Sequence, residues 1–144
     1  MKNILAMSLS LSLLLSACSS KTLTEVKPSV VIDQFEQSET FVVYLGLSYC
    51  SACKIFRSII ETVMKTEDEL EVLYIEYDKQ IETEAEDLNL LITNHLQQKE
   101  AFSYSFPILY VVKDGLIIDQ FSLQQTDTEA EFIARMVKNG VITE

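Results

Sequence analysis

Residues 41–54 read Phe-Val-Val-Tyr-Leu-Gly-Leu-Ser-Tyr-Cys-Ser-Ala-Cys-Lys, and the interpretation of the whole chain begins with this stretch. It opens with a continuous apolar run, Phe41–Leu45, whose β-branched and aromatic residues are typical of a strand buried on both faces. Gly46 ends the run, and Cys50 and Cys53 follow shortly after it. The stretch therefore predicts a buried strand that leads directly into a Cys-x-x-Cys pair.

The residues after the pair predict an amphipathic helix over Ser51–Lys65. Its apolar residues recur at helical spacing and define one face. They are Cys53, Phe56, Ile60, Val63 and Met64. The two cysteines thus lie at the start of a helix, which raises the Cys-x-x-Cys pattern above a chance occurrence.

Strand and helix patterns alternate through the rest of the chain. Ser29–Gln37 fits either a short helix or an edge strand. The remaining strands are predicted at Glu71–Tyr77, Ile108–Val112 and Leu116–Phe121, and the remaining helices at Glu82–Leu96 and Thr126–Lys138. This order predicts an α/β fold in which helices cover a central sheet.

Two details of these later elements are predicted from single residues. Asp114-Gly115 is a strong signal for a hairpin turn between the last two strands. In the last helix Asp127 or Thr126 is the expected N-cap and Gly140 the expected stop. Its apolar face is expected to consist of Ala130, Ile133, Ala134 and Val137.

The cysteine pair has a redox interpretation and three alternatives. Cys50 lies where the orphan N–H groups and the helix dipole favour a thiolate, the attacking species in thiol–disulfide exchange. Cys53, one turn further along, is then the shielded resolving thiol. The alternatives are a structural disulfide, half of a zinc site, or two thiols paired by chance. Zinc needs two more ligands, and the chain has one histidine, His95, so we expect no metal and no cofactor.

The pattern of elements and motifs over Phe41–Gly140 resembles the thioredoxin fold. Residues 49–54 stand where that family has Trp-Cys-Gly-Pro-Cys-Lys, residues 106–109 match its cis-proline strand entry, and residues 113–115 match its hairpin. The resemblance implies a three-layer α/β/α sandwich with a mixed sheet of four to five strands. It also implies a cis bond before Pro107. The catalytic residues it implies are Cys50 and Cys53, and the substrate-binding residues are Tyr49, Ser51, Ala52, Phe106 and Pro107.

This sequence departs from the family at three places. Tyr44 stands where thioredoxins have a buried aspartate that assists proton transfer, Ser58 replaces the proline of the active-site helix, and Ser51-Ala52 replaces Gly-Pro. A narrower resemblance, carried by residues 43–46, Cys50, Cys53-Lys54 and Phe56, is to bacteriocin transport accessory proteins. That resemblance implies a role beside bacteriocin maturation or export.

The N-terminus reads as a bacterial secretory leader. Residues 1–17 combine Lys2 with an apolar stretch too short to span a membrane. The stretch ends in Leu15-Ser16-Ala17-Cys18, which resembles the lipoprotein box and implies cleavage before a lipidated Cys18. The predicted division is a signal peptide at 1–17, a lipidated tether at 18–28 and one domain at 29–144. The alternative is an ordinary signal peptide with a chance cysteine.

The charge composition excludes some classes of binding partner. The 144 residues carry a formal net charge of -11, so binding to nucleic acid is not expected. An anionic membrane would also repel this surface, so attachment has to be covalent or through a partner. The sequence therefore predicts an extracytoplasmic, membrane-tethered thiol–disulfide oxidoreductase. Its partners would be exported proteins or peptides and a membrane redox protein. The alternative is a thioredoxin-fold binding module whose cysteine pair is structural or vestigial.

Cys18→Ala tests the anchor. We expect this variant to lose detergent-phase partitioning and labelling by a fatty-acid analogue, because the thioether that holds the lipid cannot form. Cys50 and Cys53 should still form their disulfide in the variant. A wild-type protein that is free in the medium, with a mature N-terminus other than Cys18, would contradict the prediction.

Overall fold

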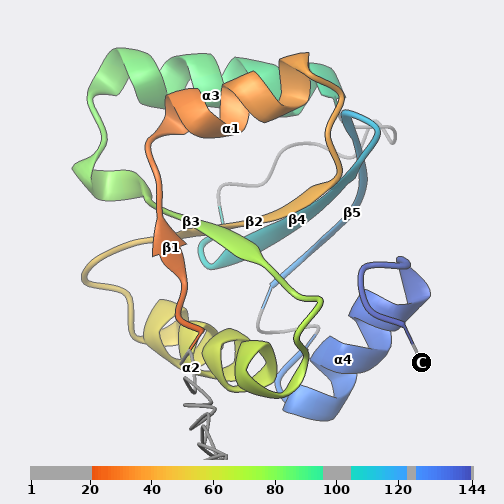
Figure 1. The fold of residues 1–144 in the computed structure, drawn as a ribbon. Helices are drawn as coiled ribbons and strands as arrows, with labels where there is room; N and C mark the ends of the chain where they lie inside the picture. The colour runs from red at the N-terminus through yellow and green to blue at the C-terminus, as the bar shows by residue number, and fades with distance from the viewer. Residues whose placement is uncertain (1–20, 96–104, 123–125, 144) are drawn as a thin grey trace, which may run out of the picture.

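The computed structural model describes residues 21–95, 105–122 and 126–143. Strands and helices alternate along the chain, as the sequence patterns predict (Figure 1). The elements are β1 (Thr24–Glu25), α1 (Pro28–Glu36), β2 (Phe41–Gly46), α2 (Ser51–Thr66), β3 (Val72–Glu76), the 3-10 helix η1 (Tyr77–Lys79), α3 (Glu82–His95), β4 (Ile108–Lys113), β5 (Leu116–Phe121) and α4 (Glu129–Lys138).

The described strands form one five-stranded mixed sheet in the order β1-β3-β2-β4-β5. β2 runs parallel to β3 and antiparallel to β4, so the strand that leads to the cysteines lies at the centre of the sheet. β1 is parallel to β3 at one edge, and β5 is antiparallel to β4 at the other. The predicted α/β class and mixed sheet are confirmed.

Helices cover both faces of the sheet, which gives three layers (Figure 1). α1 and α3 lie on one face, and α2 and α4 lie on the other. Successive residues of β2 alternate between the two cores: Val42 and Tyr44 pack towards α2, whereas Val43 and Leu45 pack towards α1 and α3. This burial on both sides is the physical reason that β2 has no polar interruption.

The hairpin between β4 and β5 forms at the predicted residues. Asp114 has φ 51° and Gly115 has φ 73°, so both central residues of the two-residue turn are left-handed. A Cβ on Gly115 would also stand 3.1 Å from the Cα of Ser38. Glycine at 115 therefore satisfies both the turn and the close approach of the loop after α1.

The folded part begins before residue 29, so the predicted tether at 18–28 is too long. Leu23 is buried in the core beside α2, and residues 24–25 form β1 against β3. A two-residue strand has no detectable apolar period, and for this reason the sequence did not reveal it. The interval between Cys18 and the fold is therefore shorter than predicted.

The structure decides one element that the sequence left open between helix and strand, and it moves the start of another helix. Residues 28–36 are a helix, with Pro28 at the first turn, where a missing N–H costs nothing. α4 begins later than predicted, because its N-cap is Thr128, whose Oγ1 accepts the backbone N–H of Glu131 at 3.2 Å. The fully buried residues of α4 are Phe132 and Met136, and the predicted Ile133 and Val137 are partly buried against the same core, whereas Ala130 and Ala134 are exposed.

A polar network fixes α4 to β5. Arg135 donates hydrogen bonds to both carboxylate oxygens of Asp119 at 2.6 and 2.7 Å, and Asn139 donates a third at 2.7 Å. The Arg135 guanidinium also lies 4.2 Å from the centre of the Phe121 ring. Partial burial opposes ionisation of Asp119, but the hydrogen bonds from Arg135 and Asn139 outweigh it and hold the pKa of this carboxyl below its ordinary value.

Asp119→Asn should lower the free energy of unfolding by about 2 kcal/mol near neutral pH, because hydrogen bonds to a charged group are lost. The pKa of Asp119 is lower in the folded protein than in the unfolded one. Its contribution is therefore complete above the unfolded pKa, about 4, and disappears as the pH falls through the folded pKa. Urea unfolding at several pH values should show the two proteins converging in acid.

The matched control is Asp33→Asn, at an exposed position on α1. It should change the free energy of unfolding by less than about 0.5 kcal/mol. A loss in Asp119→Asn that stays constant from neutral pH to pH 3 would contradict the assignment of the network.

Candidate active site

Cys50 and Cys53 form a disulfide at the start of α2, with their Cα atoms 5.2 Å apart. Cys50 is the N-cap residue of this helix, and its Sγ accepts the backbone N–H of Cys53 at 3.1 Å. The side chains differ in access, since Cys50 is half-buried and Cys53 is 4% exposed. The predicted order of exposure is therefore confirmed: a reagent or client meets Cys50 first.

The position of Cys50 at the N-terminus of α2 favours the thiolate form of its sulfur. The first N–H groups of a helix have no intrahelical acceptor, and the helix dipole adds a partial positive charge there. A thiolate on Cys50 would accept such an N–H, as the sulfur already does in the disulfide form. Cys53 lies one turn further in, packed on the apolar face with Phe56, and burial disfavours its anion.

Tyr44 connects β2 to the redox pair. Its hydroxyl donates a hydrogen bond to the backbone carbonyl of Cys53 at 2.9 Å, and the side chain is fully buried. Burial, with a smaller effect of Tyr74, raises the pKa of Tyr44 well above its ordinary value, so the phenol stays protonated and remains a donor. The residue that replaces the expected aspartate therefore holds the helix in place rather than accepting a proton.

The small size of Gly46 makes room for this contact. A Cβ at residue 46 would stand 2.8 Å from the Tyr44 hydroxyl, closer than van der Waals contact allows. Sequence reasoning identified Gly46 only as the end of the strand. The hydroxyl at position 44, two residues before the glycine, was the available signal for the close approach.

A cleft of about 190 Å³ reaches the buried Cys53 from the side of α2 and β3. Arg57 lies over the ring of Tyr74 at 4.8 Å from its centre, and Tyr74 stacks on Tyr44 with centroids 5.3 Å apart. Lys54 and Glu76 also line the cleft. Two cations thus stand in the cleft that Cys53 faces, which sequence spacing alone did not predict.

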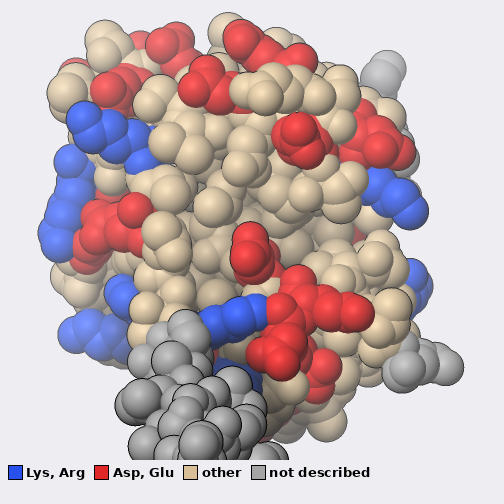
Figure 2. Space-filling view, viewed as in Figure 1, with Lys and Arg blue, Asp and Glu red and all other residues tan. Residues whose placement is uncertain are grey.

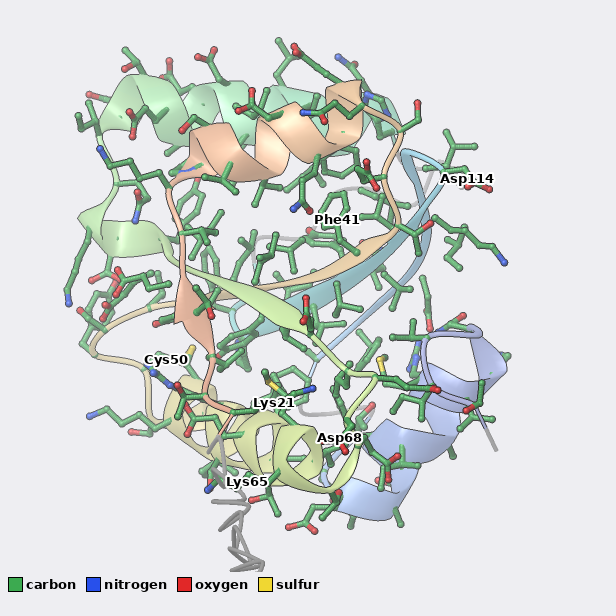
Figure 3. All side chains as sticks on the ribbon, viewed as in Figure 1. Lys21, Phe41, Cys50, Lys65, Asp68 and Asp114 are labelled. Atoms are coloured by element: carbon green, nitrogen blue, oxygen red, sulfur yellow. A yellow bond between two sulfur atoms is a disulfide. The ribbon has the colours of Figure 1, made fainter. Side chains whose placement is uncertain are left out.

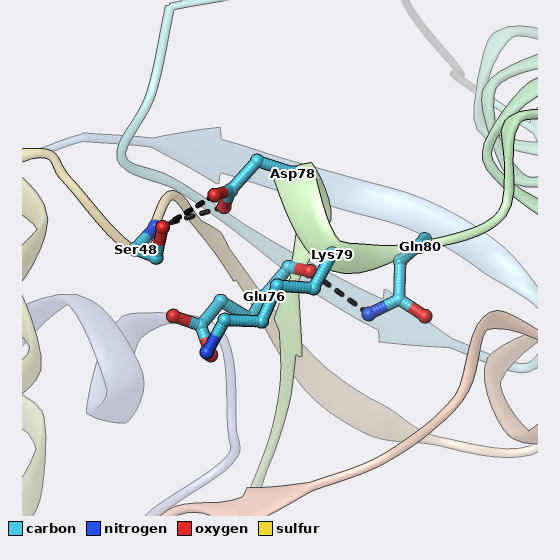
Figure 4. Close-up of polar contacts among 5 residues, drawn as sticks. All are labelled: Ser48, Glu76, Asp78, Lys79 and Gln80. Atoms are coloured by element: carbon cyan, nitrogen blue, oxygen red, sulfur yellow. Dashed lines mark hydrogen bonds and ion pairs between the residues drawn. The ribbon is translucent and has the colours of Figure 1, made fainter.

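The loop before Cys50 is fixed by Asp78 (Figure 4). Its carboxylate accepts the backbone N–H of Ser48 at 2.8 Å and also the Ser48 hydroxyl. Next to it, Lys79 pairs with Glu76 at 2.7 Å. Asp78 follows β3, whose end lies beside the end of β2, so its place after a strand was the signal available in the sequence.

The predicted substrate-binding residues lie at two places around the pair. Tyr49 is 75% exposed, Ser51 is exposed and Ala52 is half-buried in the first turn of α2. Phe106 is half-buried, and the bond between Phe106 and Pro107 is cis, as the resemblance implies. Tyr49 and Phe106 line the same groove, so the structure brings the two predicted segments together.

Cys18 and His95 are the two other residues weighed in the sequence, and neither is among the residues that the structure places at this site. Cys18 is not among the described residues. His95 ends α3, and its Nδ1 is 2.7 Å from the carbonyl oxygen of Gly115, to which it donates. Within residues 21–95, 105–122 and 126–143, no group of three or more His, Cys, Asp or Glu side chains is arranged to hold a metal ion.

Several solved structures with the same architecture are thioredoxins. Thioredoxin O2 of Arabidopsis thaliana, in its oxidised state, aligns over 81% of this chain and 93% of its own, with 12% identity and a TM-score of 0.56. A thioredoxin of Nicotiana alata aligns over 83% and 96%, with 15% identity and a TM-score of 0.57. The chain has the thioredoxin fold. A thioredoxin of Trypanosoma brucei brucei aligns over 87% and 95%, with 12% identity and a TM-score of 0.56.

Sequence comparison adds no closer relative to this thioredoxin-fold protein. No protein-family model matches the sequence, and no curated protein matches it. At 10–15% identity, the similarity to solved thioredoxins establishes the fold alone.

Alkylation of the reduced protein tests the roles of the two thiols. At mildly acidic pH we expect iodoacetamide to modify Cys50 at least about tenfold faster than Cys53, since one pKa unit changes the thiolate fraction tenfold. Mass spectrometry of tryptic peptides reads the order. In urea-denatured protein the difference should disappear. Faster modification of Cys53 would reverse the roles, and resistance of both thiols until alkaline pH would contradict a pair poised for exchange.

Proposed function

We propose that this protein is a thiol–disulfide oxidoreductase in which Cys50 exchanges with client sulfurs and Cys53 resolves the mixed disulfide. One observation carries the proposal: a solvent-accessible cysteine is the N-cap of α2 and is disulfide-bonded to a buried cysteine one turn away. A purely structural disulfide gains nothing from an accessible sulfur at a helix N-terminus, whereas a nucleophile gains reactivity there.

The exchange proceeds in two balanced steps. The Cys50 thiolate attacks a client disulfide, which forms a Cys50–client bond and releases one client thiolate. The Cys53 thiol then loses its proton, and its thiolate attacks the Cys50 sulfur, which closes the Cys50–Cys53 disulfide and releases the second client thiolate. Two electrons pass from protein to client. The reverse steps oxidise a client dithiol.

Burial opposes the Cys53 anion, so deprotonation of this thiol during resolution needs a nearby base or nearby positive charge. Tyr44 occupies the aspartate position and stays protonated, so it offers no base. Lys54 and Arg57 line the cleft at Cys53 together with Glu76, and Arg57 also pairs with Glu61. The charge of Lys54, next to Cys53 in the chain, then favours the thiolate that forms during resolution. We infer that the cleft is the path by which the proton of Cys53 reaches solvent.

We further propose that the protein works outside the cytoplasm, anchored by lipid on Cys18. The leader at residues 1–17 and its Leu-Ser-Ala-Cys ending support this. No helix within the described ranges is long and apolar enough to cross a membrane. Clients would then be exported proteins or peptides, and the resemblance around residues 43–56 favours peptides of the bacteriocin class. A membrane dithiol protein would restore the redox state.

Cysteine variants test the activity. The reduced protein should cleave a small neutral disulfide, 2-hydroxyethyl disulfide, and the disulfides of insulin. Cys50→Ser should abolish both reactions, because the attacking sulfur is lost. Cys53→Ser should accumulate a mixed disulfide with the client through Cys50, visible by mass spectrometry, because the resolving thiol is absent.

Cys18→Ala is the matched control, because it replaces one cysteine that lies outside the redox pair, and it should retain the full rate in detergent-free buffer. Glutathione titration of the Cys50–Cys53 couple then gives the direction of electron transfer. A wild-type protein that cleaves neither substrate would support the alternative, a binding module with a structural disulfide.

A further inference from the structure

A groove of about 510 Å³ lies next to the redox pair, and Tyr49, the residue before Cys50, forms part of its wall. Leu47, Tyr77 and Phe106 complete an apolar lining drawn from three separate segments. The rings of Tyr77 and Phe106 pack with centroids 5.1 Å apart, and Asn89 donates a hydrogen bond to the Tyr77 hydroxyl. The lining is therefore held in place by its own contacts, while the Tyr49 side chain stays exposed.

The remaining lining of the groove is acidic. Asp78, Glu82 and Glu86 contribute carboxylates, and the two glutamates are one helical turn apart on α3. No lysine or arginine is among the described residues that line this groove. Several acidic side chains also lie over α1 and α3 on the face that Figure 2 shows.

The nearest carboxylate to the cysteine loop is fixed and ionised. Asp78 is held by Ser48, from the same loop as Tyr49. Desolvation opposes ionisation of Asp78, but the hydrogen bonds from Ser48 outweigh it and lower the pKa of the carboxyl. The neighbouring cation Lys79 pairs with Glu76 and also lowers the pKa of Asp78. With Glu82 and Glu86 beside Asp78, the described lining of the groove carries three carboxylates and therefore net negative charge.

The other side of the pair carries mixed charge. There the cleft at Cys53 is lined by Lys54, Arg57 and Glu76, and Arg57 also pairs with Glu61 at 2.9 Å. A client segment that crosses the pair thus meets an acidic, apolar groove on the side of α3 and a cleft of mixed charge on the side of α2. This asymmetry distinguishes one kind of client sequence from another.

We infer that the groove binds an extended client segment that carries an aromatic or branched aliphatic side chain and lysine or arginine residues close to the reacting cysteine. The apolar side chain fills the space between Tyr49 and Phe106, and the cations face Asp78, Glu82 and Glu86. The inference rests on the proposed function, since the groove is lined by Tyr49, the residue before the cysteine that would react. It adds the class of client that this sulfur would meet.

Peptide binding to the disulfide form tests the inference without requiring the reaction. Three peptides of equal length, each with serine in place of cysteine, carry phenylalanine with two lysines, phenylalanine with two glutamates, or alanine with two lysines. NMR titration at low salt should give the first peptide an affinity at least about tenfold above the other two. The shifts should centre on Tyr49, Ala85 and Phe106. Raising the salt to 0.5 M should reduce the lysine preference.

A double variant, Glu82→Gln with Glu86→Gln, should lower the affinity for the first peptide at least about threefold. Its control, Glu36→Gln with Glu39→Gln, changes the net charge equally near Phe41, at the end of β2 away from Cys50 (Figure 3). The control should stay within about twofold of wild type.

Equal binding of all three peptides, shifts centred elsewhere, or equal effects of the two double variants would overturn the inference. The cleavage of 2-hydroxyethyl disulfide separates this failure from failure of the proposed function. A protein that cleaves that small neutral disulfide but shows no peptide preference keeps the proposed function and loses the inference. A protein that prefers the lysine peptide but cleaves nothing keeps the groove and loses the function.

Discussion

The hydrogen bond from the Tyr44 hydroxyl to the Cys53 carbonyl fixes the first turn of α2 to the central strand of the sheet. Because β2 is buried on both faces and paired on both edges, it is firmly held within the sheet. The bond transmits that constraint to the turn that carries both sulfurs. Gly46 makes it sterically feasible, since any Cβ there would collide with the hydroxyl. Tyr44 thus stands at the position of the aspartate in thioredoxins, but it acts by fixing the backbone at Cys53.

Much of this arrangement could be predicted because it depends on the pattern of residues close together in the sequence. The apolar run at 41–45, the helix after Cys50 and the Asp114-Gly115 turn each follow from neighbouring residues, and all three are confirmed. The cis bond at Pro107 came only from the resemblance, because few X-Pro bonds are cis. β1 could not be predicted, since two residues have no period and only tertiary pairing with β3 defines them.

The candidate site was predictable in its sulfurs but not in its surroundings. Spacing and helix position identified Cys50 and Cys53, whereas Tyr74, Glu76 and Asp78 come near them through the fold. Such contacts depend on which strands pair and where each strand ends, and neither is encoded in a short window. The face of α4 was predicted only in part, since Ile133 and Val137 pack against the core but Ala130 and Ala134 are exposed. Small alanines fit the helical period, but the larger Phe132 and Met136 gain more from burial and decide the orientation.

The edge strand β1 also determines how the protein would stand on a bilayer. Because β1 runs parallel to β3, the chain enters it at the end of the sheet where Lys21 contacts the carbonyl of Asp68, beyond the last turn of α2 (Figure 3). Cys50 lies at the other end of that helix, whose 16 residues span about 24 Å. From Cys18 to Leu23 an extended chain reaches at most about 18 Å. A lipid on Cys18 would therefore keep the base of the domain close to the headgroups and turn its sulfurs outward, so that clients would meet them from the aqueous side within a few nanometres of the membrane.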